Sequence, residues 1–211
     1  MKKVICIVML LIGAIAYVQA QEEEGENTNF TSFPVNYTGQ KPVITDFVTA
    51  ILSQNNGEGV FVEMAENWKK YQKGETLPKG RSFTVDTKNG YIRYDVTYSK
   101  EESVYVEFCF WNSTDGKHKI VASNFVLLLN GKPTDTELTG QAFYQYDNAT
   151  KKMIYTYAYD LGVQPEYPNG AKCNLPRVGK SIEYVSDTPS GKMTQRFTWN
   201  GSKFVAEKIT K

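Results

Sequence analysis

The spacing of apolar residues predicts two helices near the start of the folded part of the chain. A first stripe recurs at intervals of three and four residues, as one face of a helix does: Ile44, Phe47, Val48, Ile51 and Leu52. Asn and Gly at 55–57 would end this helix, because both accept the left-handed conformation at a C-terminus. A second stripe predicts a helix over residues 60–73, formed by Phe61, Met64, Ala65 and Trp68. Its first residues, Val-Phe-Val, also suit a short strand.

From Ser82 onward apolar and polar residues alternate, which is the period of a strand with one buried face. Three times an aspartate and four turn-forming residues separate runs rich in β-branched and aromatic residues; these segments begin at Asp86, Asp147 and Asp187. Aspartate, asparagine, glycine and proline favour turns, and the flanking residues suit a pleated sheet. The pattern predicts consecutive antiparallel hairpins.

The first hairpin has one apolar face. A four-residue loop after Asp86 pairs Val85 with Ile92 and leaves the opposite face polar. The same register places Phe83 opposite Tyr94.

The second hairpin, with strands over 103–111 and 119–129, is apolar on both faces. Such strands are usually central in a sheet and covered on both sides. We expect the helices to cover one face, which gives an α+β fold. The predicted architecture is two N-terminal helices packed on a large, twisted antiparallel β-meander of about eight or nine strands. A curled, barrel-like sheet is the alternative, since a sheet this long must curl.

The first twenty residues have the features of a secretory signal peptide. Lys2 and Lys3 are positive, residues 4–16 are apolar, and Ala20 offers a small residue for cleavage. A membrane anchor is the alternative, but the apolar run is short for a span. With 1–20 as the signal peptide, we expect an exported protein that is periplasmic, secreted or at the cell surface. No membrane span is expected after signal cleavage.

A flexible acidic leader over residues 21–40 is expected to precede a single α+β domain over 41–211. The 24 basic and 23 acidic residues nearly balance, and no basic stripe stands out. The charge therefore gives no indication of a nucleic-acid partner.

Two cysteines follow the signal, Cys109 and Cys173, and an even number in an exported protein permits a disulfide. Two separate buried thiols are the alternative, because Cys109 falls in the middle of a predicted strand. With one histidine, His118, the chain lacks the N and S ligands of a transition-metal site. Glycine-rich phosphate loops are also absent. We predict neither a metal nor a cofactor.

The sequence assigns no catalytic residue. His118 lies near Ser113 and Asp115, but all three fall in one exposed turn, which does not favour a triad. Asp95 and Glu107 fall on neighbouring strands and could approach each other as the paired carboxylates of a glycosidase. The favoured interpretation is that both are solvated carboxylates on a polar face, opposite arginine or lysine side chains.

Five tyrosines of the third hairpin, residues 141–160, are the best candidates for a binding site. They are expected on one side of the hairpin: Tyr144, Tyr146, Tyr155, Tyr157 and Tyr159. Tyrosine combines apolar area with a polar tip, so such a face stacks on sugar rings or forms a protein interface. The alternative is a second core layer whose hydroxyls reach its edge.

Four segments carry a resemblance: GYIRYDVTY, FCFWNSTDGKHKIVA, FYQYDNATKKM and FTWNGSKF. They resemble an uncharacterised family of exported β-rich proteins from gut Bacteroidetes, and the likeness covers residues 60–205. The WN-x-x-DGKHK turn and the YDNATKK hairpin are its most specific parts. The resemblance implies an exported β-rich domain. It implies no activity, cofactor or catalytic residue.

These features predict a non-catalytic binding or interaction module of the periplasm or cell surface, with an unknown protein or glycan partner. One alternative is a small-ligand or glycan binder that uses the aromatic face or a cavity inside a curled sheet. The other is a carboxylate-based hydrolase.

Overall fold

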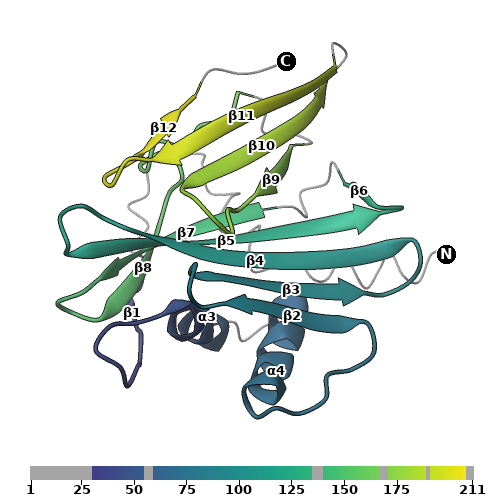
Figure 1. Ribbon diagram of the computed structural model, residues 1–211, viewed down its shortest axis with the longest axis horizontal. Coiled ribbons are helices and arrows are strands. Elements are labelled where there is room, and N and C mark those ends of the chain that lie inside the picture. Colours follow the sequence, from purple (N-terminus) through teal and green to yellow (C-terminus); the bar gives the residue numbers. More distant parts are fainter. Residues whose placement is uncertain (1–29, 55–58, 135–139, 167–170, 189–190, 208–211) are drawn as a thin grey trace.

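In the part of the chain that the structure describes, two helices and two antiparallel sheets form three layers (Figure 1). The computed structural model describes residues 30–54, 59–134, 140–166, 171–188 and 191–207. The helices are α3 (Ile44–Ser53) and α4 (Val60–Gln72). The main sheet contains β1 (Phe33–Pro34), β2 (Arg81–Asp86), β3 (Tyr91–Thr97), β4 (Glu102–Asn112), β5 (His118–Leu129), β6 (Lys132–Pro133), β7 (Gly140–Asp147) and β8 (Lys152–Thr156). The second sheet contains β9 (Lys172–Asn174), β10 (Ser181–Thr188), β11 (Gly191–Trp199) and β12 (Phe204–Ala206).

The main sheet is open, with its two longest strands near the centre. Its order is β1-β8-β7-β5-β4-β3-β2, and β6 pairs with β5. All of its pairings are antiparallel. The predicted α+β class is confirmed. The barrel-like alternative is not adopted, because β1 and β2 lie at opposite ends of the sheet.

The turn after Asp86 fixes the register of the first hairpin. Asp86 accepts hydrogen bonds from the backbone N–H of Asn89 at 3.1 Å and from its side-chain amide at 2.9 Å. Val85 then pairs with Ile92, and the predicted register is confirmed. The side chain of Asn89 and a second hydrogen bond from Arg177 lower the pKa of Asp86 to about 2.

Asp147 organises the turn between β7 and β8 in a similar way. Its Oδ1 atom accepts the backbone N–H groups of Ala149 at 2.9 Å and Thr150 at 2.7 Å. These bonds stabilise the tight connection that a hairpin needs. The loop after Asp187 includes residues 189–190, which lie outside the described residues.

Both predicted helices form and turn their apolar residues to one face of the main sheet. The backbone N–H of Val43 donates to Asp46 Oδ2 at 2.8 Å, which satisfies a backbone donor at the start of α3. The first predicted stripe is buried throughout: Ile44, Phe47, Val48, Ile51 and Leu52. Residues 60–62 belong to α4 and not to a strand. The expected stop at 55–57 lies outside the described residues.

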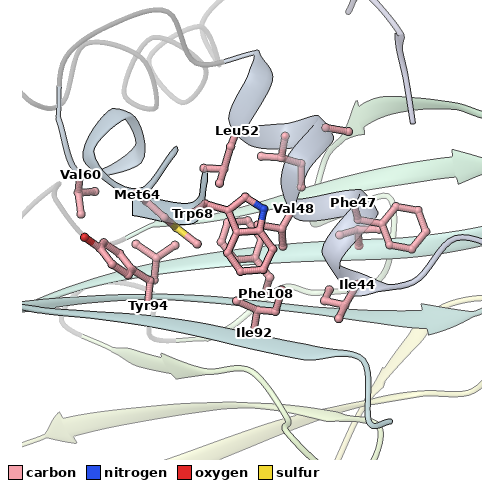
Figure 2. Packing of buried hydrophobic residues seen from close by; sticks show 14 of the residues in the cluster. Ile44, Phe47, Val48, Leu52, Val60, Met64, Trp68, Ile92, Tyr94 and Phe108 are labelled. Carbon is pink, nitrogen blue, oxygen red and sulfur yellow. The ribbon is translucent and has the colours of Figure 1, made fainter. Parts of the chain in front are cut away.

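The helix-side core forms where α3 and α4 meet β3 and β4. Figure 2 shows Val48, Met64 and Trp68 above Ile92 and Phe108. Each large apolar side chain that is fully buried contributes about 1.5–3 kcal/mol. This packing fixes one face of the sheet as core.

The second sheet covers the opposite face of the main sheet, with the order β12-β11-β10-β9. Tyr91, Cys109, Trp111 and Phe143 of the main sheet pack against it. The sequence suggested one continuous meander, but the chain leaves the main sheet after β8. The physical reason is that β4 and β5 are apolar on both faces, and the helices cover only one of them.

The segment before α3 is part of the folded sheet. In β1, Phe33 pairs with Met153 and Pro34 with Lys152, and Val35 is buried. These residues fall inside the expected leader, residues 21–40. The structure therefore places the end of that segment in the domain.

Candidate functional site

The five candidate tyrosines divide into buried and accessible positions. Tyr144 and Tyr155 face each other across β7 and β8, with ring centres 6.0 Å apart and nearly perpendicular planes. Tyr146 is fully buried, 5.1 Å from the ring of Phe47, and its hydroxyl donates to the Tyr37 hydroxyl at 3.4 Å. Tyr146 therefore belongs to the core layer and not to a surface, because its position faces α3.

Tyr157 directly follows β8, and Tyr159 lies in the turn after it, so both are beyond the strand itself. The Tyr157 ring is 5.6 Å from Tyr155 and 5.2 Å from Tyr159. The planes of Tyr157 and Tyr159 differ by only 21°. Tyr159 is 52% exposed, whereas Tyr155 and Tyr157 are half-buried. The rings thus form a line from the edge of the core to solvent, which we call the tyrosine ladder (Tyr144, Tyr155, Tyr157 and Tyr159).

The segment before α3 supplies partners for the tyrosine ladder that the sequence did not single out. The Phe30 ring lies 4.6 Å from Tyr155 and 5.4 Å from Tyr157. Phe33 lies 6.1 Å from Tyr144. The sequence signal that could have identified these partners is the presence of two phenylalanines in an otherwise polar stretch. Their contacts restrict the ladder, because aromatic pairs at this spacing attract one another.

A buried carboxylate lies on the opposite face of the main sheet. Glu107 is only 5% exposed, and its Oε1 atom accepts the Tyr91 hydroxyl at 2.7 Å. Its Oε2 atom accepts the Asn124 amide at 3.0 Å and the Leu175 backbone N–H at 3.3 Å. Nη1 of Arg93 lies 3.5 Å from Oε1. Three donors and a cation compensate the buried charge, as such a group requires.

Hydrogen bonds continue from this carboxylate into the second sheet. The fully buried Asn124 also donates to the backbone carbonyl of Cys173 at 2.9 Å and accepts from Gln141 at 3.4 Å. The Tyr184 hydroxyl donates to Gln141 Oε1 at 3.1 Å. Polar contacts therefore join β5 and β7 to β9 and β10.

Arg93 lies between the two carboxylates that the sequence proposed as a catalytic pair. Its Nε and Nη2 atoms donate to Asp95 Oδ1 at 2.9 and 2.7 Å, and Nη1 approaches Glu107. Asp95 is partly solvated, as expected, but Glu107 is buried. The expectation of two solvated carboxylates is wrong for Glu107, because Leu175 and the second sheet cover this part of β4.

The two cysteines are free, buried thiols on facing sheets. The disulfide that the sequence permitted is not present in the structure. Burial, together with the negative charge of Glu107, raises the pKa of Cys109 and of Cys173. Thiols of this kind are poor nucleophiles at neutral pH.

His118 connects two neighbouring turns. Its Nδ1 atom lies 2.7 Å from Asp115 Oδ2, and Nε2 lies 3.4 Å from Asp147 Oδ2. Ser113 bonds to His118 through the backbone, N–H to carbonyl, at 3.1 Å. This arrangement joins the second hairpin to the third, and both imidazole nitrogens face carboxylates. Within the described residues, no group of three or more His, Cys, Asp and Glu side chains is placed to hold a metal ion.

Known proteins offer no guide to this geometry, because no protein-family model, curated protein or solved structure matches the chain. The resemblance to exported Bacteroidetes proteins stays a prediction. Over the residues described, no helix has the length and apolar character needed to cross a membrane.

Proposed function

We propose that the protein is a non-catalytic binding module of the periplasm or cell surface, with Tyr157 and Tyr159 at the centre of its contact surface. The observation that supports this proposal is the nearly parallel stacking of the two rings, with Tyr159 more than half exposed. Rigid aromatic side chains supply large contact area at little cost in conformational entropy. A stacked, exposed pair held by a packed ladder is typical of a surface that contacts a partner.

A glycan is the partner that this geometry favours. The flat face of a tyrosine ring packs against the apolar face of a sugar ring, and a hydroxyl at its edge forms hydrogen bonds. The exposed Asp160 beside the pair supplies a carboxylate that accepts hydrogen bonds from sugar hydroxyls. A protein partner remains the broader candidate, since exposed tyrosines are also frequent at protein interfaces.

The hydrolase alternative receives less support from the contacts around its proposed pair. A glycosidase needs one carboxylic acid that donates a proton and one carboxylate that faces the substrate. Here both Asp95 and Glu107 contact the guanidinium of Arg93, and Glu107 also accepts three hydrogen bonds. These contacts favour a structural ion pair.

A glycan array with the purified protein tests the proposal, followed by titration of any bound glycan. Tyr159→Ala should weaken binding about tenfold, because one aromatic contact is worth about 1–1.5 kcal/mol. Tyr159→Phe should retain most of the affinity, since it keeps the ring. Tyr98→Ala is the matched control: Tyr98 is 42% exposed and lies at the other end of the sheet, after β3.

Equal loss of binding in Tyr159→Ala and Tyr98→Ala would contradict the tyrosine ladder as the contact site. If the array gives no bound glycan, the same three variants can be compared in a pull-down from the source organism's envelope fraction. If Tyr159→Ala then captures the partner as well as the wild-type protein does, the result would contradict the proposal.

A further inference from the structure

The hydroxyl of Tyr105 is a buried polar group without a hydrogen-bond partner among the residues that the structure describes. Tyr105 lies on β4, is 2% exposed, and faces the second sheet with Glu107 and Cys109. Buried polar groups are nearly always paired, and each exception calls for an explanation such as strain, a functional role, or a water or ion at the site. Burial, together with the negative charge of Glu107, raises the pKa of Tyr105. The hydroxyl is therefore protonated at neutral pH and able to donate.

Two cations lie against the ring of Tyr105. The guanidinium carbon of Arg93 is 3.9 Å from the ring centre, and Nζ of Lys172 is 5.8 Å from it. Lys172 begins β9, and no carboxylate of the described residues lies within salt-bridge distance of its ammonium group. Within the described part of the chain, a lysine that lies against the Tyr105 ring thus has no carboxylate partner.

Most acceptor oxygens around Tyr105 are already engaged, whereas several donors are not. The oxygens of Glu107 accept three hydrogen bonds, and Asp95 Oδ1 accepts two from Arg93. The donors with remaining capacity are the Tyr105 hydroxyl, the Lys172 ammonium, and Nη1 of Arg93, which lies 3.5 Å from Glu107 and carries two hydrogens. A ligand that completes this set must supply acceptors.

We infer that Tyr105, Arg93 and Lys172 form a binding site for the carboxylate group of a small ligand. A carboxylate offers two oxygens in one plane and accepts from phenol, guanidinium and ammonium donors. The two positive charges of Arg93 and Lys172 equal in number the negative charges of Asp95 and Glu107, so the cluster is neutral before the ligand binds. A ligand with a single negative charge therefore meets less repulsion from Asp95 and Glu107 than a phosphate with two.

The site lies on the face of the main sheet opposite the one that carries the tyrosine ladder. Figure 1 shows β9 at one edge of the second sheet, next to the main sheet. The Arg93 side chain is 32% exposed, so a ligand approaches from its side. Because the two sites share no residue, this inference does not depend on the proposed function of the ladder.

A carboxylate of this kind occurs in two sources, an acidic sugar and the free end of a peptide. D-Glucuronate and N-acetyl-alanine represent them in a titration followed by ¹H–¹⁵N NMR of the full-length protein. We expect saturable shifts of backbone amides in β3, β4 and β9 with at least one of the two, and the tighter ligand identifies the source. D-Glucose and inorganic phosphate are the matched controls, and neither should give saturable shifts in these strands.

Three variants locate the binding. Tyr105→Phe removes only the unpaired hydroxyl and should weaken carboxylate binding at least tenfold without lowering the melting temperature. Tyr94→Phe makes the same change at a buried tyrosine on the helix side of the sheet, where the hydroxyl donates to Glu63 at 3.0 Å, and should leave binding unchanged. Lys172→Gln should also weaken binding, and it serves as the second variant if Tyr105→Phe folds poorly.

Two results would overturn the inference. The first is the absence of saturable shifts with both carboxylates, or equal shifts with phosphate. The second is wild-type affinity in both Tyr105→Phe and Lys172→Gln, which would mean that an ordered water satisfies the hydroxyl.

Discussion

Glu107→Gln should strongly destabilise the protein, although the change removes one charge and keeps the shape of the side chain. Oε2 accepts N–H groups of Asn124 and Leu175, while Oε1 accepts the Tyr91 hydroxyl and faces Arg93. In one orientation the glutamine NH₂ group faces the N–H groups of Asn124 and Leu175. In the other it faces the Arg93 guanidinium and the Tyr91 hydroxyl, which would have to turn and accept. Each buried group left without a partner costs about 1–3 kcal/mol, so we expect a loss of roughly 3 kcal/mol.

Asp95→Asn is the matched control, because it makes the same chemical change in the other carboxylate that binds Arg93. The Asp95 side chain is 39% exposed, so solvent replaces much of what the mutation removes. Exposed ion pairs contribute about 0–1 kcal/mol. The two variants therefore separate the effect of burial from the effect of charge.

Urea unfolding at pH 7, followed by tryptophan fluorescence, measures both variants. The free energy of unfolding falls by about 2 kcal/mol for each mole per litre of urea. The urea concentration at the unfolding midpoint should therefore fall by roughly 1.5 M for Glu107→Gln and by less than about 0.5 M for Asp95→Asn. Both variants should keep the wild-type dependence of the free energy of unfolding on urea concentration, because only then does a shift in midpoint report a change in stability alone. A fall for Glu107→Gln no larger than that for Asp95→Asn would refute the argument that a buried, fully paired carboxylate joins the sheets.

Two further predictions concern turns. Asn89 and Arg177 lower the pKa of Asp86 to about 2, below the unfolded value of about 3.9. The stability that Asp86 contributes should therefore be complete above about pH 4 and be lost as the pH falls toward 2. An NMR titration of its carboxyl carbon measures the midpoint, and a midpoint near 4 would contradict this. Gly162→Ala should cost roughly 3 kcal/mol in thermal unfolding, because Gly162 has a φ of +83° and the new Cβ would lie 2.5 Å from a backbone carbonyl oxygen of β12. Gly179→Ala, with a φ of +100° and open space, should cost only about 1 kcal/mol, and equal losses would argue against the close approach.

The elements predicted correctly are those whose determinants are local. The register of the first hairpin depends on Asp86, on four loop residues and on alternation that continues on both sides. A slip by one residue would move Ile92 from the core to the opposite face, so the pattern admits one register. The stripe of α3 is equally local, since its members lie within nine positions.

The second sheet could not be predicted from the same signals. Alternation in β10 and β11 fits an extension of the main sheet as well as a separate one. β9 has only three residues and follows an irregular stretch, so its pairing with β10 has no pattern of its own. Which face β9–β12 cover is decided by the apolar faces of β4 and β5, which lie far away in the sequence.

The buried carboxylate shows the same limit for the candidate site. In the sequence, Glu107 is one polar residue in an apolar strand, and glutamate side chains are usually exposed to solvent. Its donors Tyr91, Asn124 and Leu175 lie 16, 17 and 68 positions away. Only the tertiary fold brings them together, so no local pattern could identify the cluster.

Each proposed site includes a residue of the main sheet that the covering elements enclose only in part. The helices and the second sheet bury its central strands on both sides, whereas Arg93 on β3 and Tyr155 on β8 are half-buried. A fully buried tyrosine reaches a partner only beside a half-buried neighbour, as Tyr105 lies beside Arg93. A fully exposed one lacks neighbours that hold it still. Half-covered positions combine a fixed geometry with access to solvent. The extent of coverage, set by apolar packing at the centre of the sheet, therefore determines where this fold can bind.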